Sequence, residues 1–170
     1  VRNIKYLKKL KEKCMSANFI DIADYKTKQL NDILFVAHQI KSGLISPTPL
    51  INKTIALIFE KSSTRTRISF EVGIKQLGGT SLVLTSNDMQ LSRGETIADT
   101  ARVMSRYVDA VMIRAQSHKT LLEFKENSEI PIINGLTNVS HPCQIMADIM
   151  TIQENFSCIE GLNISCLSLI

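Results

Sequence analysis

The sequence predicts an α/β fold, in which a doubly wound and mostly parallel sheet carries helices on both faces. Two patterns alternate along the chain. Short apolar runs such as residues 54–59 are typical of parallel strands that are covered on both faces. Between such runs, apolar residues recur every three or four positions, as they do over residues 26–41, which is the spacing of one helical face. This alternation favours parallel strands joined by helical crossovers.

The elements expected from these patterns follow one another closely. Strands are expected over residues 54–59, 81–84, 109–113, 130–133 and 162–170. Helices are expected over residues 26–41, 64–77, 92–108, 121–124 and 145–152. The helix after the second strand is expected to begin at a capping box, Ser92 to Glu95. In an open parallel sheet the ligand lies at the carboxyl ends of the strands, so we expect a site in the loops that follow them.

Length and composition indicate a single globular domain. The chain has 170 residues, of which 44% are hydrophobic and 21% charged, which is enough for one good core. Its net charge of +4 arises in the first 13 residues, where Lys and Arg outnumber Glu by six to one. We therefore expect residues 1–17 to be a basic extension and the domain to bind no nucleic acid. No apolar run approaches the roughly 20 residues of a membrane helix, so no membrane partner is expected.

The cysteines suit a reducing compartment. Cys14, Cys143, Cys158 and Cys166 form no Cys-x-x-Cys pair and have no ligand spacing to a histidine. Neither a zinc site nor a disulfide framework is therefore predicted, and no metal is expected. A cytoplasmic location fits this pattern best.

A run of hydroxyl and basic side chains directly follows the first strand. It occupies residues 62–67, with the sequence Ser-Ser-Thr-Arg-Thr-Arg, and leads into a helix. Hydroxyls, guanidinium groups and the N–H groups of a helix start together favour a phosphate site. The alternative is a plain helix cap by one of the hydroxyls, with Arg67 paired to Glu71 one turn later. Spacing alone leaves the two interpretations equal, although Arg67 points to a different face from Arg65 and fits the alternative.

Polar residues also follow the other strands. Arg114 ends the third apolar run, but a lone arginine there is more often a surface charge than a ligand group. After the fourth strand, Pro142 suits the first helical position, which puts His141 at the cap and Gln144 in the first turn. Taken singly, His141 fits a helix cap. The capping box after the second strand leaves Gln90, just before it, unexplained.

Several motifs in these segments resemble one known family. They are Phe59-Glu60-Lys61-Ser62-Ser63-Thr64-Arg65-Thr66-Arg67, Ser69-Phe70-Glu71, Asp99-Thr100-Ala101-Arg102, Asn134-Gly135-Leu136, His141-Pro142-Cys143-Gln144, Ala147-Asp148 and Thr151-Ile152-Gln153-Glu154. Over residues 19–153 the chain resembles the amino-terminal domain of ornithine carbamoyltransferases, within the aspartate/ornithine carbamoyltransferase family. Aspartate carbamoyltransferases share the Ser-Thr-Arg-Thr-Arg core, but usually have a Glu-Pro pair before it and lack the Asn-Gly-Leu and Thr-x-Gln-Glu features. The resemblance favours ornithine over the alternative, aspartate.

The resemblance implies a role for each matching residue. The phosphate of carbamoyl phosphate would be bound by Ser63, Thr64, Arg65 and Thr66. Its carbonyl oxygen would be faced by Thr66, Arg114 and His141. Gln144 would accept a hydrogen bond from the amide of this ligand, and Gln90 would reach a neighbouring subunit's phosphate site, which implies a homotrimer. Arg67 would be structural, and neither a metal nor an organic cofactor is implied.

The resemblance also implies a second domain of similar size, which binds ornithine and whose residues would follow Ile170. We therefore expect residues 18–157 to be the carbamoyl-phosphate-binding domain and residues 158–170 to begin the linker to the second domain. Two hypotheses stay open. The chain is the catalytic half of an ornithine carbamoyltransferase, inactive alone, or it is a carbamoyl-phosphate-binding module or remnant without turnover. In either case it is a fragment, the product of a truncated gene, or one of two chains.

Overall fold

The computed structural model describes residues 18–46, 48–85, 89, 94–156 and 159–165 of the chain. Within them, four parallel strands form one sheet in the order β2-β1-β3-β4. The strands are β1 (Thr54–Phe59), β2 (Thr80–Thr85), β3 (Ala110–Arg114) and β4 (Ile132–Leu136). The helices are the 3-10 turn η1 (Ile22–Asp24) and α2 (Thr27–Lys41), α3 (Thr64–Gln76), α4 (Ile97–Tyr107), α5 (His118–Glu126) and α6 (Pro142–Asn155). The predicted doubly wound, parallel α/β fold is confirmed.

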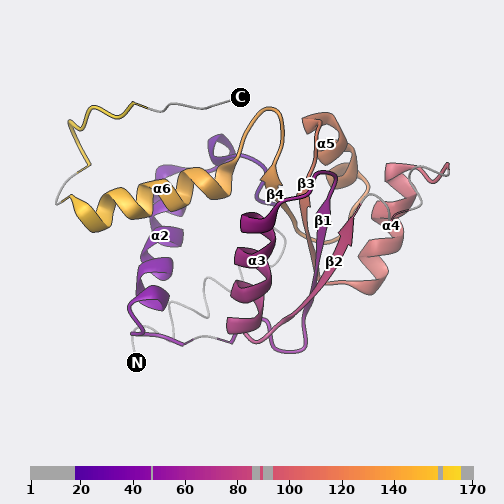
Figure 1. Ribbon diagram of the computed structural model, residues 1–170, viewed down its shortest axis with the longest axis horizontal. Coiled ribbons are helices and arrows are strands. Elements are labelled where there is room, and N and C mark those ends of the chain that lie inside the picture. Colours follow the sequence, from indigo (N-terminus) through magenta and orange to yellow (C-terminus); the bar gives the residue numbers. More distant parts are fainter. Residues whose placement is uncertain (1–17, 47, 86–88, 90–93, 157–158, 166–170) are drawn as a thin grey trace.

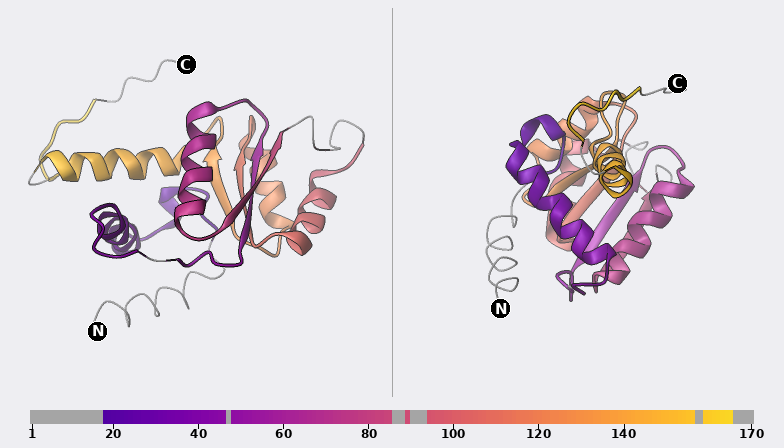
Figure 2. Two further views of the ribbon diagram at one scale, coloured as in Figure 1. Left: turned by 60° about the horizontal axis from the view of Figure 1, so that its bottom comes forward. Right: turned by 90° about the vertical axis from the view of Figure 1, so that its left-hand side faces the viewer.

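Helices cover both faces of the sheet. α4 and α5 pack together on one face, and α3, α2 and α6 lie on the other (Figure 1). In Figure 1 the strands run upwards, and both α3 and α6 begin near their upper, carboxyl ends. α2 and α6 lie side by side (Figure 2), where Lys41 Nζ donates to Glu154 Oε2 at 2.7 Å and a His38 ring nitrogen lies 3.0 Å from Gln153 Oε1.

Alternate side chains of the central strand enter two separate cores. Ala56 and Ile58 belong to the core under α4 and α5. Ile55 and Leu57 point the other way, into a smaller core that includes Ile74 of α3. Because successive side chains of a strand point to opposite faces, both sets are buried. The unbroken apolar run of β1 follows from its burial on both sides.

The order of the strands reverses beside β1. The chain runs from β1 through α3 to β2, then returns past β1 through α4 to β3 and on to β4. The chain therefore leaves β1 and β3, which are neighbours, towards opposite faces of the sheet, and ligands of such sheets bind at this point. Two hydrogen bonds join the segments: Glu60 N donates to Arg114 O at 3.0 Å, and Gln116 N donates to the Glu60 carboxylate at 2.6 Å.

The fourth strand starts and ends later than expected. The sequence predicts residues 130–133, whereas β4 spans Ile132–Leu136. Asn134, inside this strand, is fully buried, and its amide has partners: Nδ2 donates to Ile20 O at 2.9 Å and Oδ1 accepts from Leu136 N at 3.0 Å. A buried amide that is hydrogen-bonded in this way is tolerated inside a sheet. The strand therefore continues through Asn134, although this residue is polar.

Helix α4 begins later than the capping box predicted at Ser92. Its cap is Thr96, whose Oγ1 accepts a hydrogen bond from Asp99 N at 3.1 Å. Thr96 also donates to the Asp99 carboxylate at 2.8 Å. Thr96 and Asp99 have the same spacing of three residues as Ser92 and Glu95, so spacing could not separate the two starts.

The remaining predictions differ in outcome. The helix over residues 26–41 and the strands over residues 54–59, 81–84 and 109–113 are confirmed to within about two residues. Residues 162–165 form no strand, and the rest of the strand expected over residues 162–170 lies outside the described residues. In the described part of the chain, no helix is long and apolar enough to cross a membrane.

Replacing Gly135 with alanine should destabilise the fold by about 1–3 kcal/mol, because the core of β3 and β4 would be overpacked. A Cβ at this buried position would overlap Met112 Sδ and lie 3.3 Å from Ile113 O. Met112 is itself fully buried, so it cannot simply move aside. Denaturant unfolding measures the change. Gly73→Ala is the matched control, since a Cβ there meets nothing within 4 Å and alanine favours the helix. Equal stabilities would contradict this packing.

Candidate functional site

The first turn of α3 follows the carboxyl end of β1 with no side-chain cap. Ser63 occupies the N-cap position, as one sequence interpretation expected, but its side chain makes no capping hydrogen bond. The helices α4, α5 and α6 are each capped by a side chain. The N–H groups of this turn and the positive end of the helix dipole favour an anion at the start of α3.

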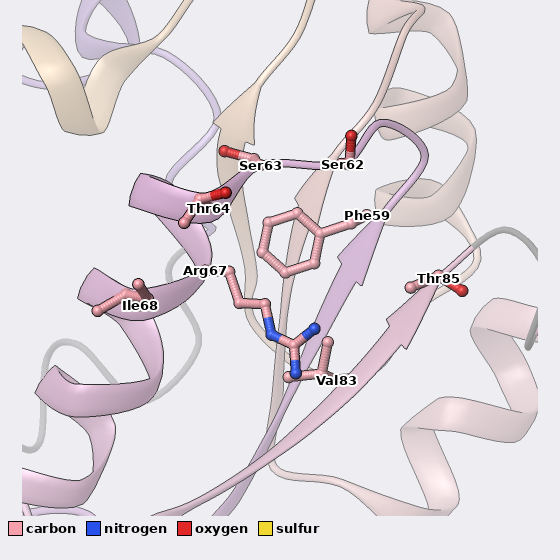
Figure 3. A pocket seen from close by; sticks show the side chains of 8 residues that line it. All are labelled: Phe59, Ser62, Ser63, Thr64, Arg67, Ile68, Val83 and Thr85. Carbon is pink, nitrogen blue, oxygen red and sulfur yellow. The ribbon is translucent and has the colours of Figure 1, made fainter.

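Arg67 lies on the surface of α3. Its Nε is 3.4 Å from Glu71 Oε2, which is the pair predicted one turn apart. Figure 3 shows its guanidinium extending past Phe59 towards Val83, away from the hydroxyl of Ser63. An exposed ion pair of this kind stabilises a helix only slightly. The pairing with Glu71 nevertheless accounts for Arg67 without a role in ligand binding.

A hollow of about 360 Å³ lies between α3 and β2 (Figure 3). It is lined by Phe59, Ser62, Ser63, Thr64, Arg67, Ile68, Val83 and Thr85. Neither Arg114 nor His141 lines it, and its one arginine is already paired with a carboxylate. The candidate anion site is therefore the side of the helix start that faces β3, where the charged groups described next converge.

Arg114 connects the end of β3 to the start of α3. Its Nη1 donates to Thr66 Oγ1 at 3.0 Å. Its Nε is buried and has no hydrogen-bond partner among the described residues. Burial, and then the nearby charge of Arg65, lower the pKa of Arg114, although a guanidinium remains protonated at neutral pH. Two neighbouring positive charges and an unsatisfied donor favour an anion or a carbonyl oxygen at this point.

His141 caps α6, with Pro142 at the first helical position, as predicted. Its Nδ1 accepts a hydrogen bond from Gln144 N at 3.4 Å, so the proton of the neutral ring is on Nε2. Burial, and then the charge of Arg114, lower the pKa of His141, while Asp148 acts in the opposite direction. The imidazole is therefore neutral at pH 7 and can donate a hydrogen bond from Nε2.

The next turn of α6 contributes a carboxylate. Gln144 Nε2 donates to Asp148 Oδ1 at 2.8 Å. Asp148 thus acts on both site residues of α6, through a hydrogen bond to Gln144 and through its charge at His141. It was not among the predicted site residues, and its spacing of four from Gln144 on a helix is the signal that could have identified it.

Cys143 is not suited to nucleophilic chemistry. Burial raises the pKa of its thiol to about 11, and Sγ lies 3.5 Å from Asn134 O. The reactive form of cysteine is the thiolate, which is scarcely populated at neutral pH with such a pKa. The site therefore favours chemistry that depends on hydrogen bonds and charge.

The structure brings most of the predicted site residues together. Hydrogen bonds and charge interactions join Arg65, Thr66, Arg114 and His141 in one cluster at the carboxyl ends of β1 and β3. Gln144 lies in the same helical turn as His141. Ser63 and Thr64 lie in the uncapped start of α3, and Gln90 lies outside the described residues. Among the described residues no group of three His, Cys, Asp or Glu could hold a metal ion.

The fold and the candidate site are typical of a domain that binds an anionic ligand at the switch point of a parallel sheet. Comparison with known families identifies it further. The model of the aspartate/ornithine carbamoyltransferase carbamoyl-P binding domain matches residues 17–154. The chain therefore belongs to the aspartate/ornithine carbamoyltransferase family, of which it contains the carbamoyl-phosphate-binding domain.

Individual relatives agree with the family. The ornithine carbamoyltransferase of Rhodopseudomonas palustris strain BisA53 is 53% identical over 156 residues, covering 87% of this chain and 50% of that protein. That of Methanosphaera stadtmanae is 58% identical over 137 residues, covering 81% and 45%. The solved structure of ornithine carbamoyltransferase from Pyrococcus furiosus matches with a TM-score of 0.82 at 46% identity, covering 86% and 48%. The chain spans about half the length of the curated relatives it matches.

The imidazole of His141 should titrate below its ordinary pKa of 6.5, because burial and Arg114 disfavour its charged form. As the pH falls, the unfolded chain takes up this proton first. The free energy of unfolding should therefore decrease from about pH 6.5 down to the pKa of the folded state. NMR of the imidazole protons measures this pKa. Arg114→Gln should raise it, and no change in that variant would contradict the proximity of the two side chains.

Proposed function

We propose that the chain binds carbamoyl phosphate and takes part in the transfer of its carbamoyl group to the amine of ornithine, which yields citrulline and phosphate. The observation that carries the proposal is the position of Arg114. Its guanidinium donates a hydrogen bond to Thr66 at the helix start, lies close to the charge of Arg65 and to the imidazole of His141, and keeps a buried Nε that has no partner among the described residues. The names of the relatives favour ornithine as the acceptor.

The phosphate would be bound at the start of α3, by Ser63, Thr64, Arg65 and Thr66. The uncapped N–H groups and the helix dipole support this placement, because they provide positive charge and donors in fixed positions. An anion there would also relieve the repulsion between the guanidinium groups of Arg65 and Arg114. The same groups would stabilise inorganic phosphate as it leaves.

The carbonyl end of the ligand would face three donors. Arg114 is one, and Thr66 is the second, since its Oγ1 accepts from Arg114 and so keeps its own hydrogen for the ligand. The third is His141 Nε2–H. When an amine attacks the carbonyl carbon, negative charge grows on this oxygen, and removal of one such donor typically slows a reaction by about 10² to 10³. Holding both substrates in line would supply much of the remaining acceleration.

The amide end of the ligand would donate to Gln144, and the binding residues for ornithine would lie outside these 170 residues. The half-length match to the relatives supports the second point. It also keeps a second candidate function in view, a module that binds carbamoyl phosphate without turnover. The two functions share the binding site described above and differ in whether citrulline is formed once the ornithine-binding residues are also present.

We also propose that the protein is a cytoplasmic homotrimer in which Gln90 reaches a neighbour's phosphate site. Apolar surface beside this chain's own proposed phosphate site supports an interface: Ile68 and Val72, one turn apart on α3, are 54% and 47% exposed. Exposed apolar side chains that lie close together are typical of contact surfaces. Sedimentation of the protein would measure its oligomeric state.

Arg65→Ala should weaken carbamoyl phosphate binding by at least about tenfold, because it removes a charged hydrogen-bond donor to the phosphate. Arg67→Ala is the matched variant two residues away and should change the affinity by less than about threefold, since Arg67 pairs with Glu71. Calorimetric titration measures both. The opposite ranking would move the anion to the hollow between α3 and β2, and equal affinities of Arg65→Ala and the parent would refute the site.

The purified 170-residue chain should bind carbamoyl phosphate and form no citrulline when ornithine is added. The physical reason is that the amine must be held in line with the carbonyl carbon, and the residues that would do so are assigned to another part of the protein. A colorimetric assay for citrulline measures the product, with a full-length relative as the positive control. Citrulline production by this chain alone would overturn that assignment.

A further inference from the structure

The carboxylate of Asp148 fixes the orientation of a side-chain amide at the edge of the site. Gln144 Nε2 donates to Asp148 Oδ1 at 2.8 Å, across one turn of α6. An ionised carboxylate has acceptors only, so it attracts the NH2 end of an amide and repels its oxygen. The Gln144 amide has two possible orientations, and Asp148 therefore stabilises the one in which Nε2 faces its carboxylate.

This orientation turns the oxygen end of the amide away from Asp148. Oε1 and Nε2 lie on opposite sides of the amide carbon, Asp148 lies one turn towards the carboxyl end of α6, and His141 caps its amino end. Oε1 accepts no hydrogen bond within the part of the chain that the structure describes. It is thus an available acceptor in the first turn of α6, the turn that His141 caps.

Asp148 also acts on the second site residue of α6. The charged groups that influence the His141 imidazole are Arg114, from β3, and Asp148, from the next turn of its own helix. The two have opposite effects on its protonation, and Asp148 is the negative one. The carboxylate is therefore close enough to affect both groups that α6 contributes to the site.

We propose that Asp148 is a positioning residue that determines ligand specificity, because it holds Gln144 Oε1 towards the ligand and so lets the domain distinguish carbamoyl phosphate from acyl phosphates. This inference rests on the proposed function and deepens it. Acetyl phosphate has the same phosphate and carbonyl groups, but a methyl group replaces the NH2. The methyl group cannot donate to Oε1, which would be left without a partner.

The test compares the affinities of carbamoyl phosphate and acetyl phosphate, measured by calorimetry on the purified chain. The two ligands carry similar charge, so their affinity ratio cancels most of the general electrostatic effect of removing a carboxylate. The parent should prefer carbamoyl phosphate. Asp148→Asn keeps the shape of the side chain but can donate as well as accept, so Gln144 is no longer held in one orientation. The ratio should fall by about tenfold, which is the typical effect of one hydrogen bond.

Three variants establish that the effect passes through Gln144. Gln144→Ala should lower the ratio as much as Asp148→Asn does, and the double variant should lower it no further. Glu126→Gln is the charge control, because Glu126 is an exposed acid at the carboxyl end of α5, and it should leave the ratio unchanged. NMR should show that Asp148→Asn lowers the pKa of His141, whereas Glu126→Gln does not.

The outcomes separate this inference from the proposed function. If the parent prefers carbamoyl phosphate and Asp148→Asn keeps that preference, the role of Asp148 is overturned and the proposed function stands. Independent effects of the Asp148 and Gln144 variants would also overturn it. If the parent binds inorganic phosphate but does not discriminate between carbamoyl phosphate and acetyl phosphate, the proposed anion site is supported and the proposed role of Asp148 is overturned. Binding of none of the three ligands would overturn both proposals.

Discussion

The hydrogen bond between Arg114 and Thr66 depends on one constraint, the pairing of β1 with β3 where the strand order reverses. In that pairing Phe59 lies opposite Arg114, so both strands end at the same level. The chain leaves β1 into α3 and leaves β3 towards α5, on opposite faces of the sheet. A helix start and a guanidinium that are 48 residues apart along the chain therefore meet at 3.0 Å. His141 reaches the same place because β4 pairs with β3 and ends at the same edge.

Most of the fold could be predicted because its strands are buried on both faces. An apolar run such as β1 is short, continuous and bounded by polar residues, so its period separates it clearly from the helices. The errors occurred where polar residues satisfy each other locally. Asn134 is hydrogen-bonded inside β4, and Thr96 and Asp99 cap α4 with the spacing that Ser92 and Glu95 also have. Spacing along the chain does not reveal which partner a polar group finds.

The site was less predictable than the fold, for the same reason. Residue types and spacing left a phosphate site and a plain cap equally favoured at the start of α3, and Arg114 taken alone fitted a surface charge. Only the strand order shows that Arg114 and Thr66 are neighbours, and resemblance to a family supplied that knowledge indirectly. Asp148 is the opposite case. Its partner Gln144 is only four residues away along the chain, but Asp148 was left out of the predicted site because no ligand contact was expected of Asp148.

The crowding of positive charge at the switch point also concerns the stability of the whole domain. In the absence of ligand, Arg65 and Arg114 repel each other and a buried Nε has no partner among the described residues. Both costs belong to the folded state alone, because the unfolded chain separates the two charges and hydrates them. An anion bound at the proposed site would remove these costs and would be lost on unfolding, so the folding equilibrium would be thermodynamically linked to ligand concentration. The residues proposed to recognise the ligand would therefore make the native population depend on its supply.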